Sequence, residues 1–164
     1  MGCGTGTLTI MAKEHLGPAG QVYGIDASPE MIEAARRKAA RVKASVDFQV
    51  GLIESMPFPD DSFDVVLSSL MVHHLPGADL KRRAFAEVQR VLKPGGRFLI
   101  VDIVLPSNPL LHALMWPVLG RHLQGAEPGG YLPLLKQAGF TRIESGRLWA
   151  GLVAWVRAAK VSSS

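Results

Sequence analysis

The stretch Met1-Gly2-Cys3-Gly4-Thr5-Gly6-Thr7-Leu8-Thr9-Ile10 begins the sequence and carries glycines at positions 2, 4 and 6. Closely spaced glycines let a backbone turn sharply and approach a ligand. Such a turn usually connects a buried β-strand to a helix whose N-terminus faces the ligand. Residues 7–15 have the apolar spacing of this helix. The strand that should come before Gly2 is not in the sequence.

The composition indicates a single globular domain. The chain has 164 residues, of which 48% are hydrophobic and 20% charged, and we expect one domain over residues 1–160 with a disordered tail at 161–164. No run is long and apolar enough to span a bilayer, and no secretory signal is present. These features predict a cytoplasmic protein without stable membrane insertion. The single cysteine, Cys3, has no partner for a disulfide or a metal site.

The net charge of +4 raises the question of a nucleic-acid partner. Aromatic residues make up only 7% of the chain and are not interleaved with the basic clusters, which argues against a base-stacking surface. We therefore interpret the basic clusters as solvated helix faces and expect no nucleic-acid binding. The clusters are Arg36, Arg37, Lys38, Arg41 and Lys43, and Lys81, Arg82 and Arg83.

Hydrophobic periodicity predicts an alternation of strands and helices. Strands are expected at 21–26, 46–50, 63–69, 97–103, 140–145 and 148–158, and helices at 7–15, 28–43, 80–92, 110–123 and 131–138. Ser28 is the expected N-cap of the second helix, with Pro29 at its first position. The alternation is typical of an α/β fold with a mostly parallel sheet and helices on both faces.

Ligands of such sheets bind beyond the carboxyl ends of the strands, where Asp26 ends the expected strand at 21–26. It follows the glycine turn by about 20 residues, the spacing at which a carboxylate accepts hydrogen bonds from both hydroxyls of a ribose. The glycine spacing is G-x-G-x-G, and Thr7 stands where a dinucleotide fingerprint needs its third glycine. This departure disfavours a nicotinamide cofactor.

Five segments in register resemble the class I S-adenosylmethionine-dependent methyltransferases, in particular the ubiquinone/menaquinone-biosynthesis branch (methyltransferase type 11). They are residues 2–6 (GCGTG), 24–31 (GIDASPEM), 56–66 (MPFPDDSFDVV), 73–75 (HHL) and 92–96 (LKPGG). The resemblance implies a Rossmann-like sheet of order 3-2-1-4-5-7-6 with an antiparallel last strand. It also implies that the first, central strand is missing from this chain, so that we expect an N-terminally truncated domain that folds poorly or binds its cofactor weakly.

The resemblance further implies S-adenosyl-L-methionine as the cofactor. The glycine turn would approach its amino-acid end, Asp26 would hold the ribose, Leu52 and Ile53 would lie against the adenine, and Ser68 would be near the methionine moiety. Relatives often place Asp or Asn where this chain has Leu52, so packing and the Ile53 backbone would hold the adenine here. The implied cofactor-binding residues are Gly2, Cys3, Gly4, Thr5, Gly6, Asp26, Ala27, Met31, Leu52, Ile53 and Ser68.

Methyl transfer from a sulfonium depends mainly on positioning, so a general base is optional. His73 follows the fourth strand and is the candidate base, with a helix-capping or wall residue as the alternative. Asp64, inside an apolar strand, is expected to be a buried, hydrogen-bonded structural residue. The apolar segment from Leu110 to Trp116, continuing to His122, is either core or a lid over an apolar acceptor.

Two functions remain open from the sequence. The first is an enzyme that transfers a methyl group to a small-molecule acceptor, with His73 as the one candidate catalytic residue. The second is a non-catalytic methyltransferase-like fragment or regulatory partner. The acceptor cannot be deduced from the fold, because the variable segments of the domain determine it.

Overall fold

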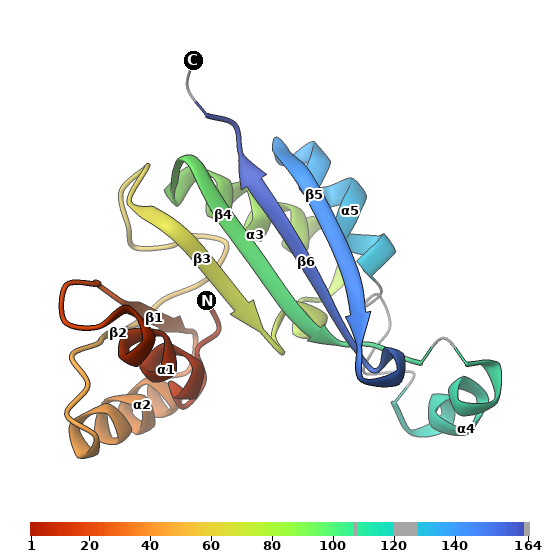
Figure 1. Cartoon of the computed structure of the whole chain (residues 1–164), viewed down its shortest axis with the longest axis horizontal. Coiled ribbons are helices and arrows are strands. Elements are labelled where there is room, and N and C mark those ends of the chain that lie inside the picture. The colour runs from red at the N-terminus through yellow and green to blue at the C-terminus, as the bar shows by residue number, and fades with distance from the viewer. Residues whose placement is uncertain (107, 120–127, 163–164) are drawn as a thin grey trace. The chain divides into compact units, whose positions relative to one another are not determined.

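A computed structural model describes residues 1–106, 108–119 and 128–162 and divides into two compact units, Met1–Pro57 and Phe58–Ser164 (Figure 1). The end of the helix expected at 110–123, His122 within it, and the last two residues of the expected tail lie outside the described residues. Among the described helices, none combines the length and apolar content needed to cross a membrane.

The first unit is built on two parallel strands, β1 (Tyr23–Asp26) and β2 (Asp47–Val50). Helices α1 (Thr7–Leu16) and α2 (Pro29–Arg41) accompany them, and the buried core comprises Ile10, Ile32, Ala35, Ala39 and Phe48. The Ser28 hydroxyl accepts a hydrogen bond from the Met31 amide at 3.2 Å. This bond confirms the predicted N-cap of α2, which the local sequence alone specifies.

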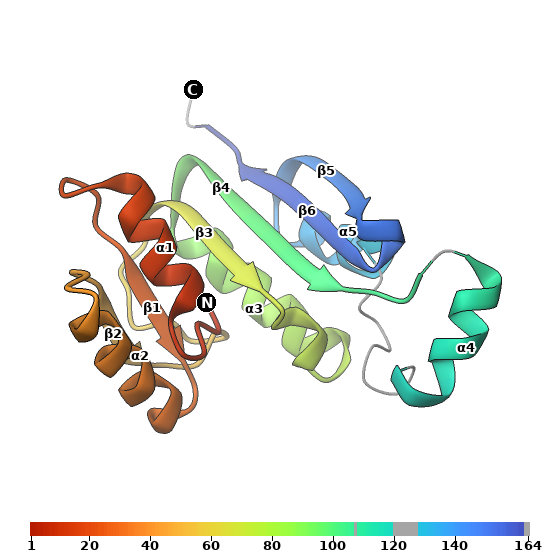
Figure 2. The same cartoon turned by 60° about the horizontal axis from the view of Figure 1, so that its bottom comes forward.

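The second unit is a four-stranded sheet of order β3-β4-β6-β5 (Figure 2). Its strands are β3 (Phe63–Ser69), β4 (Leu92–Ile103), β5 (Phe140–Leu148) and β6 (Val153–Lys160), and its helices are α3 (Gly77–Val91), α4 (Pro109–Leu119), α5 (Pro128–Gln137) and the short 3₁₀ turns η1 (Val72–His74) and η2 (Trp149–Gly151). β3 and β4 are parallel, while β6 runs antiparallel to both of its neighbours. Helices α3 and α5 lie side by side against one face of this sheet.

The pairing confirms the expected α/β class with its antiparallel last strand. β1 and β3, which the expected strand order separates by one strand, belong to different sheets. β3 has the predicted bounds, and α1, α2 and β2 differ from the predicted ones by at most two residues.

Two predicted strand starts are wrong. β4 begins at Leu92 and not at residue 97, because Leu92 pairs with Phe63 before residues 93–96 bulge out of the ladder, with Gly95 at a φ of 76°. The last strand begins at Val153 and not at residue 148. Positive φ angles of 49° at Trp149 and 86° at Gly151 form the turn η2 between β5 and β6.

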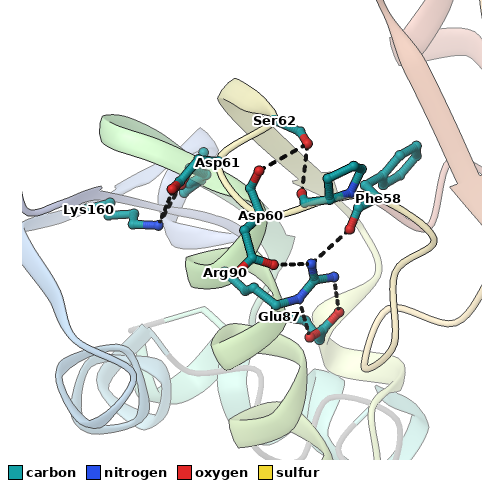
Figure 3. Close-up of polar contacts among 9 residues, drawn as sticks. Phe58, Asp60, Asp61, Ser62, Glu87, Arg90 and Lys160 are labelled. Atoms are coloured by element: carbon teal, nitrogen blue, oxygen red, sulfur yellow. Dashed lines mark hydrogen bonds and ion pairs between the residues drawn. The ribbon is translucent and has the colours of Figure 1, made fainter.

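The motif PFPDDS at 57–62 is held at the start of β3 by Arg90 of α3 (Figure 3). The guanidinium donates to the Phe58 carbonyl and to Asp60, both at 2.8 Å, and forms a two-point pair with Glu87. Glu87 and Asp60 raise the pKa of Arg90 above its ordinary value. Lys160 of β6 adds an ion pair with Asp61 at 2.7 Å. The motif that supported the family resemblance therefore has a structural role. We call the contacts that Arg90 makes with Phe58, Asp60 and Glu87 the clasp.

Candidate cofactor and catalytic site

The glycine turn is tied to the carboxyl end of β1 by backbone and side-chain hydrogen bonds. The Cys3 amide donates to the Ile25 carbonyl at 2.8 Å, and the Gly6 amide closes the turn on the Cys3 carbonyl at 2.9 Å. The Gly4 amide donates to the Asp26 carboxylate at 2.8 Å. These hydrogen bonds therefore hold the glycine turn next to Asp26, although Gly4 and Asp26 are 22 residues apart in sequence.

The Asp26 carboxylate has a second donor, the Ser28 amide at 3.1 Å. An ionised carboxylate offers roughly four acceptor positions, so two bonds leave capacity for hydroxyl donors of a ligand. The Gly4 amide is taken up by Asp26, so this amide is not open to a ligand. Asp26 is thus both the anchor of the turn and a candidate ligand group.

Glycine is required at positions 4 and 6 for different reasons. A Cβ on Gly6 would lie 2.7 Å from Cζ of Phe48 and 2.9 Å from Cβ of Ala35, inside the core. A Cβ on Gly4 would meet no atom within 4 Å. Gly4 has a φ of 51°, which lies in the left-handed region that glycine adopts without strain. The side of Gly4 on which a Cβ would stand faces open space. That space is where a ligand could approach the backbone.

The loop after β2 lies beside Asp26, because the Gly51 amide donates to the Asp26 carbonyl at 3.0 Å. Leu52 is 52% exposed and can offer its side chain to a flat ring. The Ile53 side chain is buried, so it belongs to the packing of this loop. Ala27 and Met31, which follow Asp26 at the start of α2, are also exposed.

The remaining residues of the turn are Gly2, Cys3 and Thr5. Gly2 and Cys3 are partly buried, and Thr5 is exposed. Burial, and then the negative charge of Asp26, raises the pKa of the Cys3 thiol to about 11. The thiol is therefore protonated at neutral pH, and Cys3 packs against the core of the first unit.

Ser68, placed in the second unit near the carboxyl end of β3, is 2% exposed. Its hydroxyl oxygen is the one buried side-chain polar atom without a hydrogen-bond partner among the described residues. A buried hydroxyl that lacks a partner costs free energy, and native structures contain few of them. Such an orphaned group is a candidate ligand contact.

His73 lies in η1 and is paired with Asp102 of β4, which is 1% exposed. The ring Nδ1 lies 2.5 Å from Asp102 Oδ1, and the His73 amide donates to Oδ2 at 2.9 Å. Sequence reasoning did not identify Asp102. An acid near the carboxyl end of an apolar strand was the available signal, but its partner lies 29 residues away.

Two further expectations need correction in this unit. Asp64 is exposed rather than buried, since it faces outward on β3 and pairs with Lys93 at 2.8 Å. Lys81 is buried rather than part of a solvated basic face, because its amine donates to the Leu75 carbonyl at 2.6 Å. Desolvation by burial lowers the pKa of this amine from its ordinary value.

Residues 1–100 match the family model described as a methyltransferase domain. The chain belongs to this family. Among curated relatives, this methyltransferase domain is 41% identical to an arsenite methyltransferase of Halobacterium salinarum over 63% of its own length, and 45% identical to the uncharacterized methyltransferase YcgJ of Bacillus subtilis over 56%. It is 33% identical to a demethylmenaquinone methyltransferase of Lactobacillus johnsonii over 66%. The matches cover only 26%, 35% and 44% of those three proteins.

Solved structures show the same fold. The crystal structure of YcgJ from Bacillus subtilis aligns with a TM-score of 0.76 over 99% of this methyltransferase domain and 90% of that chain, at 22% identity. The [4+2]-cyclase SpnF aligns with a TM-score of 0.80 over 99% of this domain and 73% of that chain, also at 22% identity. At this level of identity the likeness concerns the fold alone, and the reaction has to be inferred from the site.

Proposed function

We propose that residues 1–160 form a methyltransferase domain that uses S-adenosyl-L-methionine to methylate a small-molecule acceptor. The observation that carries this proposal is the hydrogen bond from the Gly4 amide to the Asp26 carboxylate. It brings a ribose-binding type of acid to a glycine turn whose spacing disfavours a dinucleotide. Membership of the methyltransferase domain family supports the same function.

The residues present fit this cofactor on two further observations. Within the first unit, the space in front of Gly4 would admit a ligand beside the backbone. Within the second unit, the orphaned Ser68 hydroxyl is a polar group that lacks a partner. Asp26 would accept hydrogen bonds from the ribose, and the exposed Leu52 would cover the adenine. When bound, S-adenosyl-L-methionine supplies a methyl group already activated by a positive sulfonium.

We expect the acceptor to be an apolar phenol or quinol rather than arsenite. Leu110 and Leu114, one turn apart on α4, are 78% and 72% exposed, and Trp116 is exposed near them. Such a helix suits a lid for an apolar molecule. Trivalent arsenic prefers thiolate ligands, but the single cysteine, Cys3, has its pKa raised to about 11.

Cofactor binding is tested by calorimetric titration with S-adenosyl-L-methionine. Asp26→Asn keeps the shape of the side chain but replaces one of two acceptor oxygens by a donor, so we expect affinity to fall about 10-fold or more. Asp47→Asn is the matched control, because Asp47 is an exposed carboxylate on the neighbouring strand β2. We expect its affinity within about 2-fold of the wild type. Equal losses in both variants, or no binding by the wild type, would contradict the proposal.

The acceptor class is tested by transfer of tritiated methyl groups to a panel of quinols, phenols, amines, lipids and arsenite. Labelling of quinols or phenols is the expected result. The double variant Leu110→Gln/Leu114→Gln should raise KM for the quinol about 10-fold, whereas Met11→Gln, an exposed position of α1, should not change it. Labelling of none of these acceptors by a chain that binds the cofactor would favour the non-catalytic alternative.

A further inference from the structure

The second unit contains a buried polar cluster formed by residues of three different elements. Asp102 of β4 accepts from the His73 amide at 2.9 Å, from the Tyr131 hydroxyl at 3.3 Å and from the Ile103 amide at 3.0 Å, and its Oδ1 lies 2.5 Å from Nδ1 of the His73 ring. Tyr131 is fully buried on α5. These three donors leave about one of the roughly four acceptor positions of a carboxylate for the ring. Asp102 is therefore a buried acid whose position is fixed by several hydrogen bonds.

This arrangement determines which ring nitrogen of His73 carries a proton. An ionised carboxylate can only accept hydrogen bonds, so Nδ1 has to donate to Asp102; the neutral ring is then protonated at Nδ1 and Nε2 keeps a lone pair. Nε2 has no hydrogen-bond partner among the described residues. The His73 side chain is 9% exposed, so Nε2 is a basic nitrogen inside the fold that no described residue engages.

Other charged or titratable groups support the same orientation. Lys81 of α3 is buried and interacts electrostatically with Asp102, while its amine fixes the Leu75 carbonyl directly after η1. The neighbouring His74 packs its ring against His73 with a centroid distance of 3.9 Å. Asp102 and His74 are thus the groups in contact with the ring, while Lys81 and Tyr131 interact with Asp102.

We propose that Asp102 is a positioning residue that holds His73 with Nδ1 protonated, so that Nε2 accepts the proton of the acceptor hydroxyl during methyl transfer. This inference rests on the proposed function. The O–H bond of the phenol or quinol breaks and its proton goes to Nε2, while the electron pair of the oxygen forms the bond to the methyl group. The C–S electron pair remains on the sulfur, and the imidazolium afterwards releases its proton to water.

The tautomer is tested independently of activity by long-range ¹H–¹⁵N correlation spectra of ¹⁵N-histidine-labelled protein near pH 7.5, assigned with His73→Ala and His74→Ala. We expect a protonated Nδ1 and an unprotonated Nε2 for His73 in the wild type. The Asp102→Asn spectrum should show a mixture of tautomers, because an amide can accept from or donate to the ring. A wild-type ring protonated at Nε2 would overturn the proposal.

Catalysis is tested by the separation of kcat from cofactor affinity. His73→Ala should lower kcat about 100-fold or more, and Asp102→Asn should lower it at least about 10-fold. Both should leave the Kd for S-adenosyl-L-methionine within about 2-fold. The exposed control Asp64→Asn should keep both this Kd and kcat. An unchanged kcat in His73→Ala would overturn the role of the base. If the wild type binds no cofactor, the proposed function fails while the spectra still decide the tautomer.

Discussion

The ring of Phe48 occupies the space beside the α-carbon of Gly6, so that a Cβ at that position would lie 2.7 Å from the ring. The turn is therefore packed into the core of the first unit at Gly6, while Gly4 of the same turn faces open space. Substitutions at Gly6 and Gly4 can therefore test core packing and ligand approach separately.

We expect Gly6→Ala to destabilise the first unit by about 2–4 kcal/mol, through overpacking and a positive φ. Gly4→Ala should cost only about 1 kcal/mol from its positive φ, but it should weaken binding of S-adenosyl-L-methionine because the methyl group enters the ligand side of the turn. Urea unfolding and calorimetric titration measure the two effects. Unchanged affinity in Gly4→Ala would show that no ligand approaches there.

Ser68→Ala should have opposite effects on stability and on binding. Removal of a buried hydroxyl without a partner should leave the free protein as stable or more stable by up to about 1 kcal/mol, while cofactor affinity should fall about 5-fold. Ser62→Ala is the matched control, because its hydroxyl donates to the Pro59 carbonyl at 2.7 Å. That substitution should destabilise the protein by about 1 kcal/mol without affecting affinity. A destabilised Ser68→Ala would mean that the hydroxyl has a partner in solution.

Arg90→Met should destabilise the second unit by about 1–3 kcal/mol, because it removes the hydrogen bond to the Phe58 carbonyl and the two-point pair with Glu87. Arg82→Met, on the same helix, removes an exposed pair with Asp79 and should cost less than about 0.5 kcal/mol. Thermal unfolding monitored by circular dichroism compares the two variants. Equal costs would show that the clasp seen in Figure 3 contributes no more than a surface ion pair.

The rate of Cys3 alkylation by iodoacetamide should rise with a midpoint near pH 11 in the folded protein and near the ordinary thiol pKa of 9.0 in urea. Since the folded pKa is the higher one, the protonated thiol contributes stability below pH 9 that is lost as the pH rises through about 11. Asp26→Asn should lower the folded midpoint but leave it above 9, because burial is the larger cause. A folded midpoint of 9 would contradict the burial of the thiol.

Most of the fold could be predicted because its signals are local. Ser28 and Pro29 specify the start of α2, and the apolar run of β3 specifies both of its ends. The errors occurred where tertiary structure overrides a local signal. The glycines at 95 and 96 predicted a stop, yet Leu92 already pairs with Phe63. Trp149 adopts a left-handed conformation that its residue type does not predict.

The candidate site was predicted only in part, for the same reason. Asp26 could be found from its spacing to the glycines, and the hydrogen bond to Gly4 confirms that the two are adjacent. The roles of Asp102 and Lys81 could not be predicted, because they depend on the contacts that β4 and α3 make with η1 and the residue after it. These contacts join residues that no regular sequence spacing relates. Charge patterning placed Lys81 in solvent, since a buried amine next to Arg82 is an exception to the usual rule.

The dual engagement of Asp26 has a consequence for how this domain can diverge. The same carboxylate that is available to a ligand also fastens the Gly4 amide. A change of residue 26 that altered ligand preference would at the same time release the turn, so such a change has to be accompanied by a second one that restores the anchor. Evolution or engineering of a new nucleoside preference should therefore proceed through Leu52, because its side chain is exposed and does not anchor the glycine turn.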